Sequence, residues 1–187
     1  MSAMNRATAP RNGAPCFRAA NERDVDALVR LINSAYRPTT AEAGWTHEAA
    51  IVDGPRITAR QVAETLETPD TVLLVAEIEG RVAGCIEVAA TGPEARIGTL
   101  AVSPSMQDRG LGKALLHEAE QLARRRWQIG KAVMVVLSVR HELIDFYVRR
   151  GYARTGERTR YPVDAGVGMP RDADLTIETL TKDLARD

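Results

Sequence analysis

The first part of the chain carries one strand-like and two helix-like patterns. Residues 16–20 (CFRAA) predict a short strand, and Asn21 follows as a helix N-cap with Asp24 three residues later. Apolar residues then recur at helical spacing at Val25, Leu28, Ile32 and Ala35. A second, shorter helix is predicted over residues 59–66. The stretch 37–56 contains Pro, Thr and Gly and does not continue the helical pattern. Insertions of this kind often determine substrate specificity.

Three strands are predicted next. The apolar runs 71–79 (TVLLVAEIE) and 81–90 (RVAGCIEVAA) flank Gly80, which is a hairpin signal. A third run, 95–102 (ARIGTLAV), follows a turn at Gly92 and Pro93. This order predicts a three-stranded antiparallel meander.

The second half of the chain returns to helices. From Gly110 to Trp127, apolar residues at three- and four-residue spacing predict an amphipathic helix. Residues 132–139 (AVMVVLSV) form a continuous β-branched run, typical of a strand in mid-sheet that is buried on both faces.

The C-terminal part is expected to complete the sheet. A helix over 141–150 ends at Gly151, a favourable residue after a helix C-cap, and a strand is expected near 152–155. A long loop, 158–174, then leads to a last strand over 174–184.

Composition narrows the class of protein. The 187 residues, 44% hydrophobic and 27% charged, suit one domain over 16–187 after a flexible tail at 1–15. Basic and acidic residues number 25 each, which argues against nucleic acid or an anionic membrane as a partner. No apolar run approaches the roughly 18–20 residues that span a bilayer, so a cytoplasmic location is expected.

The two cysteines indicate neither a metal site nor a redox motif. Cys16 and Cys85 lie far apart in the sequence, and we expect both to be buried, reduced thiols. Each of the three histidines is followed by a glutamate, but none has the second histidine that a zinc HExxH motif requires. No metal site is therefore predicted.

The segment 100–116 (LAVSPSMQDRGLGKALL) carries the clearest chemical signal. It reads as a strand, a short loop with Gly110 and Gly112, and the start of a helix. Glycines allow a ligand to approach the backbone, and the first N–H groups of a helix have no partners within the helix. The segment is therefore built to bind an anion such as a phosphate.

Two nucleotide-binding motifs fail at this segment. The P-loop needs Gly where Gln107 stands, and Ser or Thr where Ala114 stands. The dinucleotide fingerprint GxGxxG needs a small residue where Leu115 stands, and the preceding strands form a meander instead of opening a βαβ unit.

The segment resembles instead the Q/R-x-x-G-x-G/A signature of the GNAT superfamily of N-acetyltransferases. Gln107, Gly110 and Gly112 match the signature, and the later run 142–152 (ELIDFYVRRGY) resembles the family's helix and following strand. The resemblance covers about 17–184. It implies acetyl-coenzyme A as cosubstrate and an α/β fold with a mixed, mostly antiparallel sheet of about seven strands and about four helices.

Cofactor-binding residues follow from the resemblance. The amides of the loop and first helical turn would hold the pyrophosphate, and the strand before them would offer backbone groups to the pantetheine arm in a gap beside the 132–139 strand. Arg140 stands where many relatives have Asn, and an Arg there can reach a phosphate. The candidates are Leu100, Ala101, Val102, Gln107, Asp108, Arg109, Gly110, Leu111, Gly112, Lys113, Ala114 and Arg140.

The catalytic candidates are Tyr147 and Glu87. Tyr147 matches the family tyrosine that protonates the departing thiolate, and a phenol is protonated at neutral pH. The amine must lose a proton before it attacks, and Glu87 interrupts an apolar strand where it can accept that proton. A solvent-facing Glu87 is the alternative. In that case Glu94, His47 or a chain of water molecules would accept the amine proton.

The acceptor is expected to be a small-molecule or peptide amine. Tyr36 and Trp45 flank the early loop, which in the family closes over the acceptor, so they are candidate substrate-wall residues. A homodimer is also expected, because dimers are frequent in the family. The alternative function is a non-catalytic acyl-coenzyme A sensor, which needs the loop but neither acid nor base.

Overall fold

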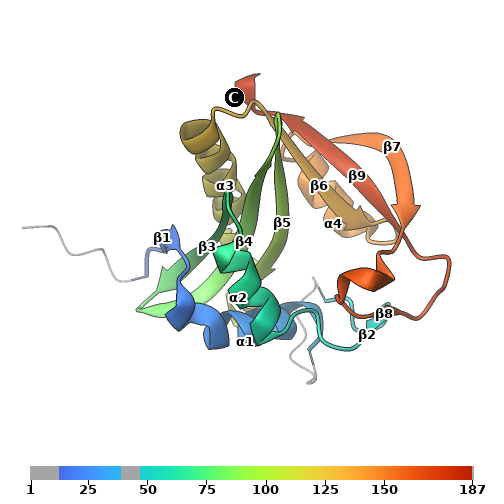
Figure 1. The fold of residues 1–187 in the computed structure, drawn as a ribbon, viewed down its shortest axis with the longest axis horizontal. Helices are drawn as coiled ribbons and strands as arrows, with labels where there is room; N and C mark the ends of the chain where they lie inside the picture. Colours follow the sequence, from blue (N-terminus) through green and yellow to red (C-terminus); the bar gives the residue numbers. More distant parts are fainter. Residues whose placement is uncertain (1–12, 39–46, 187) are drawn as a thin grey trace, which may run out of the picture.

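The protein is built around a central β-sheet with helices on both faces (Figure 1). The computed structural model describes residues 13–38 and 47–186. The seven-stranded sheet has the order β1 (Cys16–Ala19), β3 (Thr71–Ile78), β4 (Arg81–Thr91), β5 (Glu94–Val102), β6 (Lys131–Leu137), β9 (Thr176–Asp183) and β7 (Ala153–Arg160). All neighbours pair antiparallel except β5 and β6, which confirms the expected fold class.

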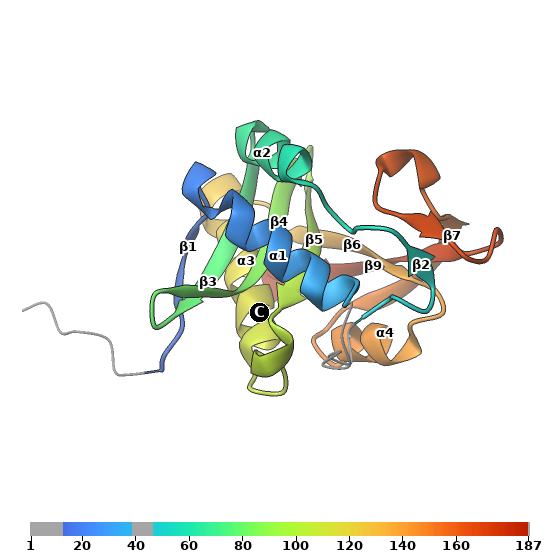
Figure 2. The same cartoon turned by 90° about the horizontal axis from the view of Figure 1, so that it is seen from below.

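Two helices cover each face of the sheet (Figure 2). The first pair is α1 (Val25–Tyr36) and α2 (Ala59–Glu67), and the second pair is α3 (Leu111–Trp127) and α4 (His141–Val148). A capping box between Asn21 and Asp24, as the sequence predicts, opens the 3₁₀ turn (Glu22–Asp24) that leads into α1. None of the helices in the described part of the chain is long and apolar enough to cross a membrane.

Close packing fixes α3 on the sheet directly after the glycine loop. A Cβ atom at Gly84 of β4 would lie 2.8 Å from Cδ1 of Leu115 and 3.1 Å from the carbonyl oxygen of Ala101. Only glycine permits this approach, because real Cβ atoms do not come so near. The start of α3 is thereby held against β4, beside the end of β5.

The sheet opens between β5 and β6. These strands pair only at Ala95 with Ala132 and at Arg96 with Val133, and they diverge beyond that point (Figure 1). The β4–β5 register shifts between Cys85 and Glu87, and Thr99 opposite the shift has a φ of +46°. This bulge bends β5 away from β6. The gap that the family resemblance implied beside 132–139 is confirmed.

Two burial expectations are wrong. Val135 on β6 is 48% exposed, because this face of the strand looks into the opening instead of against a helix. Cys16 is exposed, since it begins β1, an edge strand of the sheet. Cys85 is buried as expected, and both thiols are free.

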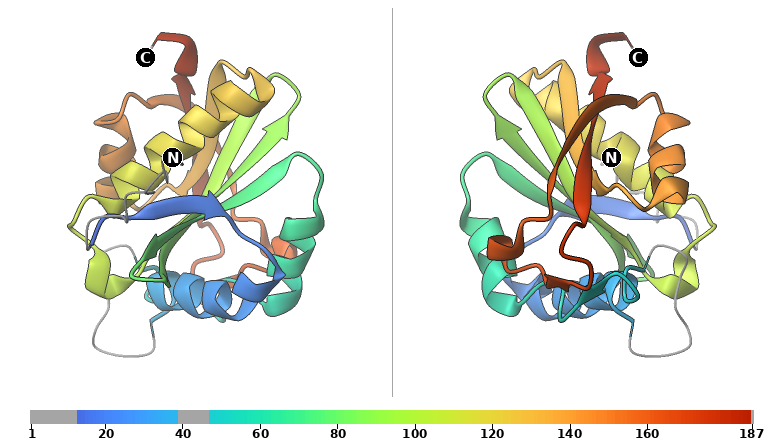
Figure 3. Two further views of the ribbon diagram at one scale, coloured as in Figure 1. Left: turned by 90° about the vertical axis from the view of Figure 1, so that its left-hand side faces the viewer. Right: turned by 90° about the vertical axis from the view of Figure 1, so that its right-hand side faces the viewer.

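The expected loop 158–174 is more ordered than the sequence indicated. Its first residues extend β7, which runs to Arg160 and not to 155. Farther on, β8 (Met169–Pro170) pairs with β2 (Val52–Asp53) in a separate two-stranded ribbon (Figure 3). This pairing brings the early insertion and the late loop together. Residues 1–12 of the expected tail lie outside the described residues.

Candidate active site

Two adjoining cavities lie where β5 leaves β6. One, of about 580 Å³, borders the glycine loop and the end of α4, and we call it the loop cavity. The other, of about 480 Å³, lies between α2, β5, β6 and the segment 161–167, and we call it the strand cavity. Both volumes suit small-molecule ligands. The residues that line both cavities are Tyr36, Leu100, Leu143 and Tyr147.

The glycine loop presents unpaired backbone donors. Asp108 and Gly110 have φ angles of +61° and +79°, and Gly110 is the N-cap of α3. The first helical backbone bond is donated by Ala114, so the N–H groups of 108–113 have no partner among the described residues. A Cβ atom at Gly110 would meet nothing within 4 Å, so the space beside the turn is open.

Cations surround the same cavity. Lys113 and Arg149 are exposed at its edge, and Arg150 is partly buried with its guanidinium 3.4 Å from the centroid of the Phe146 ring. Burial and the neighbouring charge of Arg149 lower the pKa of Arg150. A ligand with several negative charges would find both amides and cations here.

The structure brings most of the expected cofactor residues to the loop cavity. Its lining includes Leu100, Val102, Gln107, Asp108, Gly110, Leu111, Gly112 and Lys113. Ala101 does not line it, since alternate side chains of a strand point to opposite faces and this one packs against α1. Arg109 and Ala114 are also outside the lining. The N–H of Arg109 has no partner among the described residues, whereas that of Ala114 donates to the carbonyl of Gly110 at 3.0 Å and is not available to a pyrophosphate as the sequence suggested.

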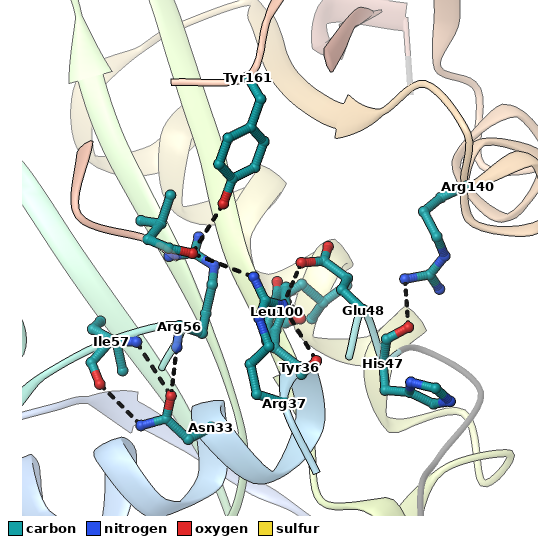
Figure 4. A network of polar contacts seen from close by, with 11 residues as sticks. Asn33, Tyr36, Arg37, His47, Glu48, Arg56, Ile57, Leu100, Arg140 and Tyr161 are labelled. Carbon is teal, nitrogen blue, oxygen red and sulfur yellow. Dashed lines mark hydrogen bonds and ion pairs between the residues drawn. The ribbon is translucent and has the colours of Figure 1, made fainter. Parts of the chain in front are cut away.

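Arg140 has other partners. Its side chain is 4% exposed, its Nε donates to the Glu142 carboxylate, and one terminal nitrogen donates to the carbonyl of His47 at 3.1 Å (Figure 4). It does not line the loop cavity. These contacts hold the start of α4 against the insertion, which differs from the phosphate contact that the sequence suggested.

Three tyrosines line the strand cavity, and their hydroxyls differ in what they bind. Tyr36 donates to the carbonyl oxygen of Leu100 at 3.0 Å, and Tyr161 donates to that of Val167 at 2.9 Å (Figure 4). The hydroxyl of Tyr147 has no hydrogen bond to a described residue. Burial raises the pKa of Tyr147 well above its usual range, so the phenol keeps its proton.

The backbone of β5 is held by side chains along its open edge. Besides the bond from Tyr36 to Leu100, the Gln107 amide donates to the carbonyl of Val102 at 3.3 Å. The free half of β5 is thus fixed although it lacks a neighbouring strand on this side.

Carboxylates line the strand cavity on three sides, and one of them, Glu64 of α2, pairs with Arg60 at the surface. Glu87 on β4 is partly buried and accepts a hydrogen bond of 3.2 Å from the hydroxyl of Thr99. It therefore faces a cavity and not open solvent. Glu48 is buried and forms an ion pair of 2.7 Å with Arg37. Glu94 pairs with Lys131 at the surface and does not line the cavity.

The late loop forms one wall of the strand cavity. Gln61 of α2 donates to the carbonyl of Gly166 at 3.1 Å, and Arg37 donates to that of Val167 at 3.3 Å. These bonds tie segment 161–167 to the helices on the other side of the opening. Trp45, the second expected substrate-wall residue, lies outside the described residues.

Sequence reasoning missed several residues of these cavities. Arg56 and Tyr161 lie in the insertion and in the late loop, where no periodicity marks them. The contact between Arg150 and Phe146 could have been predicted from the sequence, because residues four apart share one face of a helix.

The family model for the GNAT acetyltransferases matches residues 27–152, which include the meander, the glycine loop and α4. The chain belongs to the GNAT acetyltransferase family. The resemblance seen in the sequence is thereby confirmed. A search of curated proteins finds no match to this sequence.

Solved N-acetyltransferase structures share the GNAT fold with this chain. The Escherichia coli ribosomal-protein-S18-alanine N-acetyltransferase is 16% identical, with a TM-score of 0.69 over 91% of this chain and 94% of that one. The Brucella melitensis ribosomal-protein-alanine N-acetyltransferase is 21% identical, with a TM-score of 0.68 over 90% and 99%. The Thermoplasma acidophilum PaiA N-acetyltransferase, solved with coenzyme A, is 16% identical, with a TM-score of 0.67 over 91% and 99%.

Proposed function

We propose that this GNAT protein transfers an acetyl group from acetyl-coenzyme A directly to a primary amine while both substrates are bound. The observation that carries the proposal is the junction of the two cavities at Tyr36, Leu100 and Tyr147. A cofactor in the loop cavity and an amine in the strand cavity would meet there. Holding both reactants in one site removes much of the entropic cost of their encounter.

The loop cavity fits the charged part of the cofactor. Free N–H groups at 108–113, an open space beside Gly110 and the cations Lys113, Arg149 and Arg150 together suit a pyrophosphate and a further phosphate. The open edge of β5 at Leu100 and Val102 would contact the pantetheine amides, beside the hydrogen bonds that the two carbonyl oxygens already accept from Tyr36 and Gln107. When bound, acetyl-coenzyme A supplies an acetyl group activated as a thioester.

Tyr147 is the best candidate for the acid. Among the three tyrosines of the strand cavity, the hydroxyls of Tyr36 and Tyr161 already donate to carbonyl oxygens. Tyr147 keeps its proton because burial raises its pKa, and that proton is not engaged by a described residue. It can therefore donate to a thiolate as the carbon–sulfur bond breaks.

Glu87 is the candidate base. It accepts a hydrogen bond from Thr99, the residue before Leu100, and so lies next to the junction. An alkylamine is mostly cationic at neutral pH and must release a proton before its nitrogen bonds to the acetyl carbon. A carboxylate at this place attracts the ammonium and accepts the proton.

The alternative is a sensor that binds acyl-coenzyme A without catalysis. A sensor needs the loop cavity alone, whereas a second cavity with an available phenol and a carboxylate supports an enzyme. Release of coenzyme A thiol, measured with a panel of small amines and peptides, separates the two. Amine-dependent release above the rate without amine supports the transferase, and its absence with every amine would favour the sensor.

Three further expectations accompany this function. We expect the acceptor to be a small molecule or a peptide, the location to be the cytoplasm, and the protein to form a homodimer, as is frequent in the family. Sedimentation of the purified protein tests the dimer.

A further inference from the structure

Arg56 is a cation in the strand cavity without a counter-ion among the residues that the structure describes. The residue is partly buried, and its guanidinium makes no hydrogen bond or ion pair with a described residue. The other arginine that lines this cavity, Arg96 on β5, is exposed to solvent. Arg37, which lies outside the lining, is paired with Glu48. Partial burial of an unpaired charge is unfavourable, so such groups mark places where a ligand of opposite charge binds.

The backbone around Arg56 is firmly positioned. The amide oxygen of Asn33 on α1 accepts hydrogen bonds from the N–H groups of Arg56 at 2.7 Å and Ile57 at 3.2 Å (Figure 4). The amide nitrogen of Asn33 donates to the carbonyl of Ile57 at 2.9 Å. Three hydrogen bonds from one side chain thus fix the backbone at Arg56 and Ile57 before any ligand binds. This order in the free protein reduces the conformational entropy that is lost on binding.

The guanidinium of Arg56 lies close to the junction of the two cavities. The guanidinium carbon lies 5.1 Å from the centroid of the Tyr36 ring, and the hydroxyl of the same ring bonds to Leu100. Glu87 lines the same cavity and forms no ion pair within 13–38 and 47–186. The other two lining carboxylates, Glu48 and Glu64, are paired with arginines outside the cavity. Glu87 and Arg56 are thus the partly buried negative and positive groups that remain available to a single small molecule.

We propose that the acceptor amine also carries a carboxylate, which the guanidinium of Arg56 binds while the amine lies near Glu87. The acceptor then belongs to the class of amino acids and related zwitterions. A single planar guanidinium matches a carboxylate through two parallel hydrogen bonds. This inference rests on the proposed function, because it concerns the acceptor of that reaction.

The test compares amino acids with amines that differ from them only by lacking the carboxylate. Wild-type protein is expected to show higher kcat/KM for the amino acids. Arg56→Met should lower kcat/KM for amino acids by about tenfold to a hundredfold and leave that for the simple amines nearly unchanged. Arg56→Lys should recover part of the loss, because it restores the charge but not the planar fork.

Arg30→Met is the matched control, since Arg30 is an exposed arginine of α1 outside both cavities. It should retain the wild-type preference. If Arg56→Met lowers activity equally with both kinds of acceptor, Arg56 merely supports the Tyr36 ring, and the inference is wrong.

A binding measurement separates this inference from the proposed function. Calorimetry on the protein saturated with coenzyme A compares N-acetylated amino acids with the corresponding N-acetylated amines, and requires no turnover. Tighter binding of the amino-acid derivatives that is lost in Arg56→Met supports the inference even if no amine is acetylated. Equal binding of the two series would overturn it, whatever the enzyme assays show.

Discussion

The hydroxyl of Tyr36 on α1 donates a hydrogen bond of 3.0 Å to the carbonyl oxygen of Leu100 on β5. Leu100 lies beyond the last β5–β6 pair, so this part of the strand has no neighbour in the sheet on that side. The bond therefore replaces part of the missing strand pairing. It also links α1 to the junction of the two cavities.

Tyr36→Phe should loosen this edge of β5. Losing one partly buried hydrogen bond lowers the free energy of unfolding by about 1 kcal/mol. Because the Leu100 peptide is expected to face the cofactor, KM for acetyl-coenzyme A should rise. Urea unfolding and steady-state kinetics measure the two effects. Unchanged values of both would show that the bond does not position β5.

Tyr147→Phe should lower kcat while acetyl-coenzyme A binds nearly as before. Loss of a general acid costs about 10²- to 10⁴-fold in rate, since nothing then protonates the departing thiolate. Calorimetry with the cofactor and turnover with an acceptor give the two quantities. Tyr161→Phe should cost less, because the Tyr161 proton is already bound to Val167. Unaltered turnover in Tyr147→Phe removes this residue from the mechanism.

The pH dependence follows from the same tyrosine. Burial raises the pKa of Tyr147 above its ordinary value, so the acid stays protonated as the pH rises toward about 10. Turnover should increase with pH as the amine loses its proton and should not fall near pH 9 through loss of the phenol proton. A descending limb near pH 9 that disappears in Tyr147→Phe would contradict this.

Glu87→Gln should reduce turnover most at low pH. The amide cannot accept the amine proton, but at high pH the amine is already neutral and needs no base. The deficit measured as kcat/KM for the amine should therefore shrink as the pH increases. Glu94→Gln is the control, because Glu94 pairs with Lys131 at the surface. A loss in Glu87→Gln that stays constant with pH would argue against a role in proton transfer.

Gly110→Asp should abolish acetyl-coenzyme A binding. The side chain would strain a backbone with a φ of +79° and place a negative charge where phosphates are expected. Gly92→Asp provides a matched comparison, since Gly92 also has positive φ and open surroundings but lies in the β4–β5 turn. The increase in melting temperature on adding acetyl-coenzyme A should be lost in Gly110→Asp and kept in Gly92→Asp. A retained shift would mean that the loop is not the phosphate site.

Local patterns predicted the elements that form the loop cavity. The meander, the glycine loop and α3 are consecutive in the sequence, so spacing and turn residues were enough to identify them. Tyr147 followed from the family resemblance, and the structure adds that its hydroxyl is available.

The strand cavity could not be predicted in the same way. Arg56 and Tyr161 come from segments about a hundred residues apart, which meet because β2 pairs with β8 and Gln61 holds Gly166. Such long-range pairing leaves no periodic signal in either segment. The continuous apolar run at 132–139 was misleading for a related reason, since Val135 faces the opening that the bulge at Thr99 creates.

The most direct test of acetyl transfer at the cavity junction follows an isotopically labelled acetyl group from acetyl-coenzyme A by mass spectrometry. The label should appear on the amine nitrogen as coenzyme A is released, and at no time on the protein. Label bound to the protein would contradict direct transfer, and no label on any amine would contradict the proposed function.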